Sequence, residues 1–218
     1  KKLVSFNQIK KFNFDIIILS PGINIDQCKL KGFLKKNLKI IYTDLDVFYS
    51  FYKNQCITIT GTNGKSTSCQ LLYEVLKKHG LDVKLTGNIG FPILSTKNIK
   101  NKSIFIIEAS SYQLDYSQIF TSKYAAILNI SPDHLERHKT LRNYISTKFK
   151  LIQNQKKNSI AFINKHDNYI KKEIKKNKHK SKIIKIETKL KNKNINIFQK
   201  DYFSSVSNKE NLAFVIEI

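Results

Sequence analysis

Seven consecutive residues of the chain, Gly61-Thr62-Asn63-Gly64-Lys65-Ser66-Thr67, combine the residue types that bind a polyphosphate. The β-branched residues of 56–60 predict a short buried strand, and helical spacing of apolar residues starts at Lys65 and stops at Gly80. A glycine turn between strand and helix points backbone N–H groups and the positive end of the helix dipole at a ligand. Lys65 adds a mobile charge, and the Ser66 hydroxyl can hold a magnesium ion.

The glycine spacing is shorter than in the usual phosphate loop. That loop has a glycine five residues before Gly64, where this chain has Ile59, and the first glycine is Gly61. The alternative is a tight strand-to-helix turn with an exposed lysine. We favour the phosphate loop because strand, glycines, lysine, hydroxyls and amphipathic helix all agree.

Polar residues also follow four other expected strands, and the carboxyl ends of parallel strands meet at one sheet edge. These pairs are 14–19 with Ser20-Pro21-Gly22, 82–85 with Gly87-Asn88-Ile89-Gly90, 103–107 with Glu108, and 124–130 with Ser131-Pro132-Asp133-His134. Glu108 is well placed to take part in magnesium coordination. The structural alternatives are plain turns at Ser20–Gly22 and Asn88, a helix-cap region at 108–111, and a helix start at Ser131.

A helix expected at 141–153 carries a lysine among its inward-facing positions. Leu141, Ile145, Lys148 and Ile152 form one stripe at steps of four, three and four. A lysine in such a stripe usually extends its amine to water. The alternative is that the amine of Lys148 reaches into the site.

The remaining pattern predicts an α/β protein. Apolar runs suited to a parallel sheet covered by helices alternate with helical segments. Further elements are strands at 39–42, 159–163, 182–186 and 194–198, helices at 43–52 and 167–176, and an ambiguous segment at 208–218. A boundary near 50–54 divides the chain into a partial Rossmann-like domain, 1–52, and a P-loop-type ATPase domain, 53–218, with a mainly parallel sheet flanked by helices.

Composition narrows the function classes. The formal charge is +23 and the pI about 9.8, but the lysines are spread among Asn and Ile without an Arg-rich cluster, which favours compositional bias over nucleic-acid binding. Three cysteines without a Cys-x-x-Cys indicate neither a disulfide framework nor a zinc site. We expect a cytoplasmic protein without a membrane span. Because the chain opens with Lys-Lys and enters mid-domain within a few residues, we expect a fragment.

Taken together, these motifs resemble the Mur ligase family, over most of residues 14–165. The shared motifs are Ser20–Gly22, Gly61–Thr67, Gly87–Gly90, Glu108-Ala109-Ser110-Ser111-Tyr112-Gln113-Leu114 and Asn129–His138. Ser-Ser-Tyr-Gln-Leu is typical of the branch that adds D-glutamate to UDP-N-acetylmuramoyl-L-alanine. The resemblance implies a monomeric, ATP-dependent ligase of peptidoglycan synthesis, with a D-glutamate-binding C-terminal domain and the start of the first domain outside this sequence.

The resemblance also implies roles for individual residues. Gly61 to Thr67 would bind the ATP phosphates, with Lys65 on the β and γ oxygens, and Asn211 would touch the adenine. Ser66 and Glu108 would hold one magnesium ion, and His134 with a carbamoylated Lys148 a second. The sugar-nucleotide contacts would be Ser20, Gly22, Asn88, Ser110, Gln113 and His134.

Three other interpretations stay open at this point. The first is a different Mur-type or folylpolyglutamate-type ligase, which would need other residues at 110–114. The second is a basic P-loop NTPase that binds nucleic acid, which should show an Asp-rich strand end and a clustered basic face. The third is an anion-binding or structural module, which would not explain why Asn88, Glu108 and His134 all follow strands.

Overall fold

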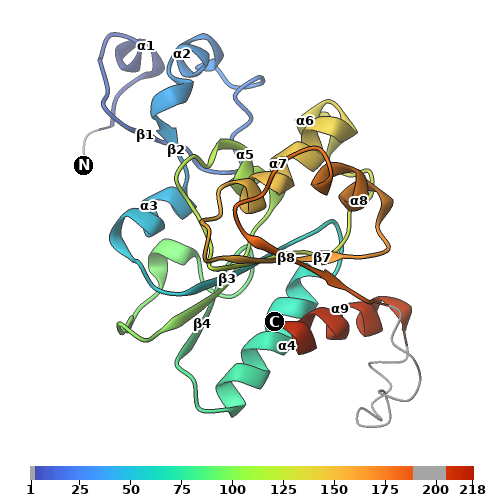
Figure 1. Ribbon diagram of the computed structural model, residues 1–218. Coiled ribbons are helices and arrows are strands. Elements are labelled where there is room, and N and C mark those ends of the chain that lie inside the picture. The colour runs from blue at the N-terminus through green and yellow to red at the C-terminus, as the bar shows by residue number, and fades with distance from the viewer. Residues whose placement is uncertain (1–2, 189–204) are drawn as a thin grey trace.

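A six-stranded parallel sheet with helices on both faces dominates the computed structural model, which describes residues 3–188 and 205–218 (Figure 1). The strand order is β4-β5-β3-β6-β7-β8, and every neighbouring pair is parallel. The strands are β3 (Cys56–Thr60), β4 (Val83–Gly87), β5 (Ile104–Glu108), β6 (Tyr124–Ile127), β7 (Ile160–Asn164) and β8 (Lys182–Ile186). The expected α/β class with a mainly parallel sheet is confirmed.

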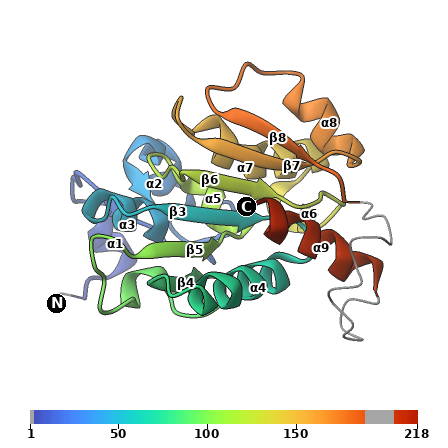
Figure 2. The same cartoon turned by 60° about the horizontal axis from the view of Figure 1, so that its bottom comes forward.

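Two helical layers cover this sheet (Figure 2). Helices α4 (Lys65–Lys78) and α9 (Val206–Glu217) pack on one face, and α3 (Asp44–Phe51), α5 (Ser111–Tyr116), α7 (Leu141–Gln153) and α8 (Asn168–Ile174) pack on the other. Phe105 and Ile107 of β5 point into the α7 layer, while Ile106 points into the α4 layer. Each such buried side chain contributes about 1.5–3 kcal/mol, so both faces must be covered.

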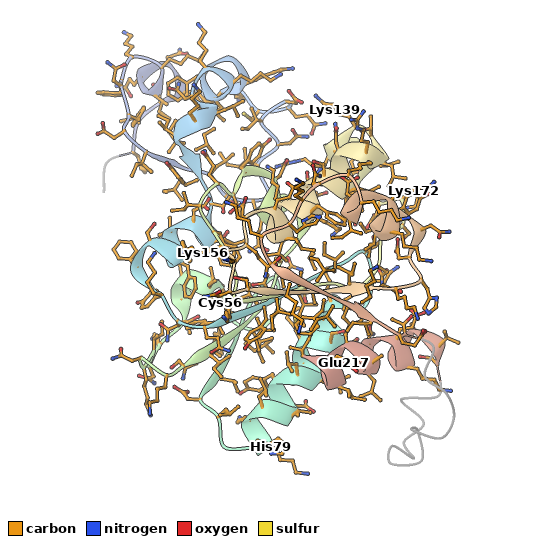
Figure 3. The ribbon with its side chains drawn as sticks, viewed as in Figure 1. Cys56, His79, Lys139, Lys156, Lys172 and Glu217 are labelled. Atoms are coloured by element: carbon orange, nitrogen blue, oxygen red, sulfur yellow. The ribbon has the colours of Figure 1, made fainter. Side chains whose placement is uncertain are left out.

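A smaller unit precedes the sheet. It contains α1 (Phe6–Ile9), α2 (Lys31–Lys36), the 3₁₀ turn Leu38–Ile40 and a parallel pair of β1 (Ile17–Ile18) with β2 (Ile41–Tyr42). Its own core is Leu19, Ile25, Leu34 and Ile41. Helix α3 joins it to the large sheet, since the rings of Phe48 and Phe105 lie 4.7 Å apart. Lys139, labelled in Figure 3, follows the short α6 (Leu135–His138) and forms an ion pair with Asp26.

Several expected boundaries were wrong. The strand expected at 14–19 is only Ile17–Ile18, because β1 pairs with β2 alone. The strand expected at 124–130 ends at Ile127, and no helix starts at Ser131: His134, in the left-handed region at φ 52°, precedes α6. Residues 208–217 of the ambiguous segment lie within α9, and the 194–198 strand lies outside the described residues.

A second 3₁₀ turn, Ile93–Ser95, follows β4. In the part of the chain that the structure describes, no helix has the length and apolar character needed to cross a membrane.

Candidate nucleotide-binding site

The loop between β3 and α4 has the geometry of an anion site. Figure 3 labels Cys56 at the amino end of β3 and His79 just after α4, and the loop joins the opposite ends of these elements. Gly64 caps α4 at φ 80°. The first N–H groups of a helix have no intrahelical partner, so those at the start of α4 are available to a ligand. Lys65 Nζ donates to the carbonyls of Gly61 (3.0 Å) and Thr62 (2.7 Å), and burial lowers the pKa of this amine.

Asn211 explains why residue 64 has no side chain. A Cβ on Gly64 would lie 2.2 Å from Asn211 Oδ1, and Asn211 is only 4% exposed. Helix α9 therefore places this amide directly against the turn. The structure brings Asn211 to the phosphate loop, and its contact with adenine stays a prediction.

Three of the expected site residues meet beside the loop. Glu108 ends β5, the strand next to β3, and is 1% exposed. Its Oε2 accepts a hydrogen bond from Ser66 Oγ at 2.7 Å, and its Oε1 accepts one from Asn88 Nδ2 at 2.8 Å. Gly87 permits this approach, since it has φ 105° and a Cβ there would lie 2.3 Å from the Glu108 carbonyl. A buried carboxylate beside a hydroxyl and an amide is an oxygen-rich setting of the kind that Mg²⁺ prefers.

Lys148 points inward from α7 rather than to water. It is 1% exposed, and its Nζ donates to the Gly61 carbonyl at 2.8 Å and to Thr60 Oγ1 at 3.3 Å. Burial, with the nearby charge of Lys65 as the second cause, lowers the pKa of Lys148 to about 7. Near neutral pH a large fraction of this amine is therefore uncharged and nucleophilic.

Tyr144 links Lys148 to His134. The Lys148 amine lies 4.8 Å from the centre of the Tyr144 ring. The centres of the His134 and Tyr144 rings lie 6.4 Å apart in an edge-to-face arrangement. The Tyr144 hydroxyl is 3.0 Å from Thr62 Oγ1. His134 also contacts Tyr112, whose hydroxyl is 3.2 Å from its Nδ1. Sequence reasoning missed Tyr144, although its place one helical turn before Lys148 could have indicated it.

Ser110 and Gln113 form a helix cap. The Gln113 backbone N–H donates to Ser110 Oγ at 3.2 Å, and the Ser110 N–H donates to Gln113 Oε1 at 3.1 Å, which is the capping-box arrangement. Gln113 Nε2 also donates to Asp44 Oδ2 at 3.0 Å. The cap alternative is thus confirmed for Ser110, and the substrate contacts of Ser110 and Gln113 remain a prediction.

Ser20 and Gly22 belong to the smaller unit and not to the sheet that carries Ser66, Asn88 and Glu108. They sit in the exposed turn after β1, within the smaller unit, where the Ser20 carbonyl accepts from the Ile23 N–H at 3.0 Å. Among the described residues, no group of three or more His, Cys, Asp or Glu side chains could hold a metal ion. A cation beside the phosphate loop would therefore need hydroxyl, phosphate or water oxygens as ligands in addition to the Glu108 carboxylate.

Residues 59–218 match the family model described as Mur ligase middle domain. This chain belongs to the Mur ligase family. The matched range includes the phosphate loop of residues 61–67, Glu108, His134, Lys148 and Asn211, whereas Ser20 and Gly22 precede it.

Individual Mur ligases show how far the similarity extends. A UDP-N-acetylmuramoylalanine--D-glutamate ligase of Rickettsia felis is 45% identical over 164 residues, 74% of this chain and 35% of the relative. The protein of the same name from Rickettsia bellii is 38% identical over 222 residues, 95% of this chain and 48% of the relative. The chain thus spans about a third to a half of these Mur ligases.

A solved Mur ligase structure supports the fold. The UDP-N-acetylmuramate:L-alanyl-gamma-D-glutamyl-meso-diaminopimelate ligase of Neisseria meningitides superposes with a TM-score of 0.56 at 16% identity. That superposition covers 82% of this chain and 60% of the other. At this identity the likeness concerns the fold alone.

Proposed function

We propose that this protein uses ATP to join D-glutamate to UDP-N-acetylmuramoyl-L-alanine during peptidoglycan precursor synthesis. The observation that carries the proposal is the buried Glu108 carboxylate, which accepts from Ser66 on the phosphate loop and from Asn88 on the neighbouring loop. The two Rickettsia relatives described above, which have this reaction in their names, are 45% and 38% identical to this chain. A binding module without catalysis would not need a buried carboxylate beside its phosphate loop.

ATP would lie over the loop of residues 61–67. The N–H groups at the start of α4 and the Lys65 amine would bind its phosphate oxygens, and Asn211 would contact the adenine. Ser66 and Glu108 would hold a magnesium ion, because their oxygens are 2.7 Å apart and Glu108 is buried. When bound, this ion would neutralise phosphate charge.

Lys148 suits conversion to a carbamate. The hydrogen-bond partners of its amine are neutral, a carbonyl and a hydroxyl, and its pKa of about 7 supplies the uncharged amine that attacks carbon dioxide. The resulting carboxylate-like group and His134 would hold a second magnesium ion. Tyr144, which lies against both side chains, would keep them in place.

The reaction would proceed in two steps. The alanyl carboxylate of the sugar nucleotide attacks the γ-phosphorus of ATP, ADP leaves, and an acyl phosphate forms. The D-glutamate amine then attacks the acyl carbon, loses a proton and expels inorganic phosphate as the amide bond forms. Lys65 would offset the repulsion between carboxylate and phosphate, and positioning would supply most of the rate.

The remaining assignments belong to the same proposal. Asn88, Ser110, Gln113 and His134 would contact the sugar nucleotide, with Ser20 and Gly22 near its diphosphate. Residues 1–52 would form part of the sugar-nucleotide domain and 53–218 the ATP domain, with D-glutamate bound by a further domain. The enzyme would act as a cytoplasmic monomer, without nucleic acid or membrane partners, and would support cell shape and division through the cell wall.

The test uses the longest reading frame that contains this sequence. Phosphate release from ATP is measured with UDP-N-acetylmuramoyl-L-alanine and with D-glutamate, L-lysine or no amine. We expect release only with D-glutamate, and its loss in Lys65→Ala. Lys77→Ala is the control, because Lys77 is exposed on the same helix as Lys65 and its amine contacts Tyr73, away from the phosphate loop. Phosphate release that does not depend on the sugar nucleotide or on the amine would refute the proposal.

A further inference from the structure

Asn129, just beyond the end of β6, binds the phosphate loop with both its backbone and its side chain. The Thr62 N–H donates to the Asn129 carbonyl at 3.0 Å. The Asn63 N–H donates to Asn129 Oδ1 at 2.9 Å, and Asn129 Nδ2 donates back to the Asn63 carbonyl at 3.1 Å. The side-chain amide thus pairs with residue 63 in the way that one strand pairs with another, across 66 positions of sequence.

The residues after Asn129 extend this attachment. The Ser131 N–H donates to Thr62 Oγ1 at 3.0 Å, and Thr62 Oγ1 is 3.2 Å from the Ser131 carbonyl that accepts its proton. The Ile130 N–H donates to Asp167 Oδ2 at 2.7 Å. Asp167 also caps α8 through the N–H groups of Tyr169 and Ile170, both at 2.9 Å. Segment 129–131 is therefore anchored on two sides, to the loop and to a helix.

This pairing divides the N–H groups of the loop into two sets. Those of Thr62 and Asn63 are directed at Asn129. Those of residues 64–67, at the start of α4, have no partner within the helix and are free to point at an anion. A loop that is held in shape before the ligand arrives needs less ordering on binding and so binds more tightly.

We propose that Asn129 is a positioning residue for nucleotide binding: it fixes the first half of the phosphate loop so that the N–H groups of residues 64–67 converge on the phosphates. The inference rests on the proposed function, because the ligand is taken to be ATP. Asn129 touches the loop and not the reacting atoms, so its loss should act through affinity for ATP.

The rival explanation is that Asn129 simply stabilises the fold, and Asn54 offers a matched control. Asn54 is likewise half-buried and lies just before β3, at the opposite end of the sheet. Its Nδ2 donates to the carbonyls of Lys100 (2.8 Å) and Ser103 (3.0 Å), so it too joins two distant segments through side-chain-to-backbone bonds. Asn54→Ala should lower stability about as much as Asn129→Ala without disturbing the phosphate loop.

The experiment measures the equilibrium Kd for ATP with Mg²⁺, the KM for the sugar nucleotide and the thermal midpoint of the parent, Asn129→Ala, Asn129→Asp and Asn54→Ala. We expect Asn129→Ala to raise the Kd for ATP about tenfold, the effect of two lost hydrogen bonds, and to leave the sugar-nucleotide KM within about twofold. Asn129→Asp should weaken ATP binding further, because a carboxylate adds negative charge beside the phosphates. Asn54→Ala should keep the parental Kd for ATP, while its thermal midpoint should fall about as much as that of Asn129→Ala.

Three results would overturn the inference. A parental Kd in Asn129→Ala would show that the pairing does not position the loop. An equal loss of ATP affinity in Asn54→Ala would show that general loosening of the sheet is the cause. A parent that binds no ATP would refute the proposed function and, with it, the role of Asn129, a failure that is distinct from the first two.

Discussion

Ser66 Oγ and Glu108 Oε2 lie 2.7 Å apart although 42 residues separate them in sequence. Adjacent pairing of β3 and β5 causes this, because it places the end of β5 next to the phosphate loop. Glu108→Gln keeps the size of the side chain and removes the charge that would hold magnesium. We expect it to slow ATP-dependent phosphate release about 100-fold, measured across a magnesium titration.

Glu74→Gln is the control for this substitution. Glu74 lies exposed on α4 and pairs with Gln70 at 2.8 Å, away from the loop. It should keep the parental rate. A parental rate and an unchanged magnesium requirement in Glu108→Gln would contradict the assignment of Glu108 as a metal ligand.

The pKa of Lys148 makes stability depend on pH in a defined direction. Burial lowers this pKa from 10.5 to about 7, so between pH 7 and 10.5 the unfolded chain holds a proton that the folded chain has released. The free energy of unfolding therefore rises with pH across this window, by up to about 1.4 kcal/mol per unit, and the penalty of burying the charge is complete below pH 7. Lys148→Met should abolish this rise while eliminating activity.

Urea unfolding at several pH values in carbon-dioxide-free buffer measures this contribution as the difference between the parent and Lys148→Met. Lys77→Met serves as the comparison, because Lys77 is exposed in the same fold. If the parent and Lys148→Met gave parallel curves of unfolding free energy against pH, the buried amine would not be the titrating group.

Hydrophobic patterns in the sequence correctly predicted the strands and helices whose formation depends mainly on their own residues. The alternation of 56–60 and the periodicity of 141–153 matched β3 and α7, because every residue of β3 is buried and α7 buries one stripe of its surface. The shortness of β1 could not be predicted, since it reflects the presence of a single partner strand. Helix α9 was ambiguous because a run of adjacent residues, 211–215, is buried, which hides any amphipathic period.

The candidate site divides in the same way. We predicted that polar residues after parallel strands would meet at one sheet edge, and Ser66, Asn88 and Glu108 do lie in contact there. The pairing of Asn129 with Asn63 leaves no periodic signal, because one side chain substitutes for a strand partner. The left-handed backbone of His134 also could not be predicted, since a non-glycine residue keeps this conformation only where its surroundings stabilise it.

Asp46 is a structural carboxylate that the sequence analysis passed over. It is 1% exposed, and its oxygens accept from the N–H groups of Thr43, Ile119 and Phe120, each at 2.9 Å. These bonds tie α3 to the segment before β6. Asp46→Asn replaces one acceptor oxygen with a donor, so we expect a loss of about 1.5–3 kcal/mol in the free energy of unfolding, measured in urea.

Asp15→Asn is the comparison for this change, because Asp15 is exposed. It should alter stability by no more than about 0.5 kcal/mol. Equal stability of Asp46→Asn and the parent would mean that the multiple N–H bonds to Asp46 do not hold α3 in place.

Gly64 and Gly80 form a natural pair for separating backbone strain from a side-chain clash. Their φ angles are 80° and 79°, yet a Cβ on Gly80 would meet nothing within 4 Å, whereas one on Gly64 would lie 2.2 Å from Asn211 Oδ1. Gly80→Ala should cost about 1–2 kcal/mol, from the left-handed backbone alone. Gly64→Ala should cost about 1–3 kcal/mol more, because Asn211 is buried and has little room to move, and it should also abolish ATP binding.

Combining Gly64→Ala with Asn211→Ala separates these two effects on Gly64. Removing the amide leaves space for the new methyl group, so the double variant should be more stable than the sum of the two single changes predicts. ATP binding should not return, since the loop would still carry a strained alanine and would lack Asn211. Additive losses of unfolding free energy would show that the Asn211 side chain does not restrict residue 64, and that backbone strain alone requires glycine there.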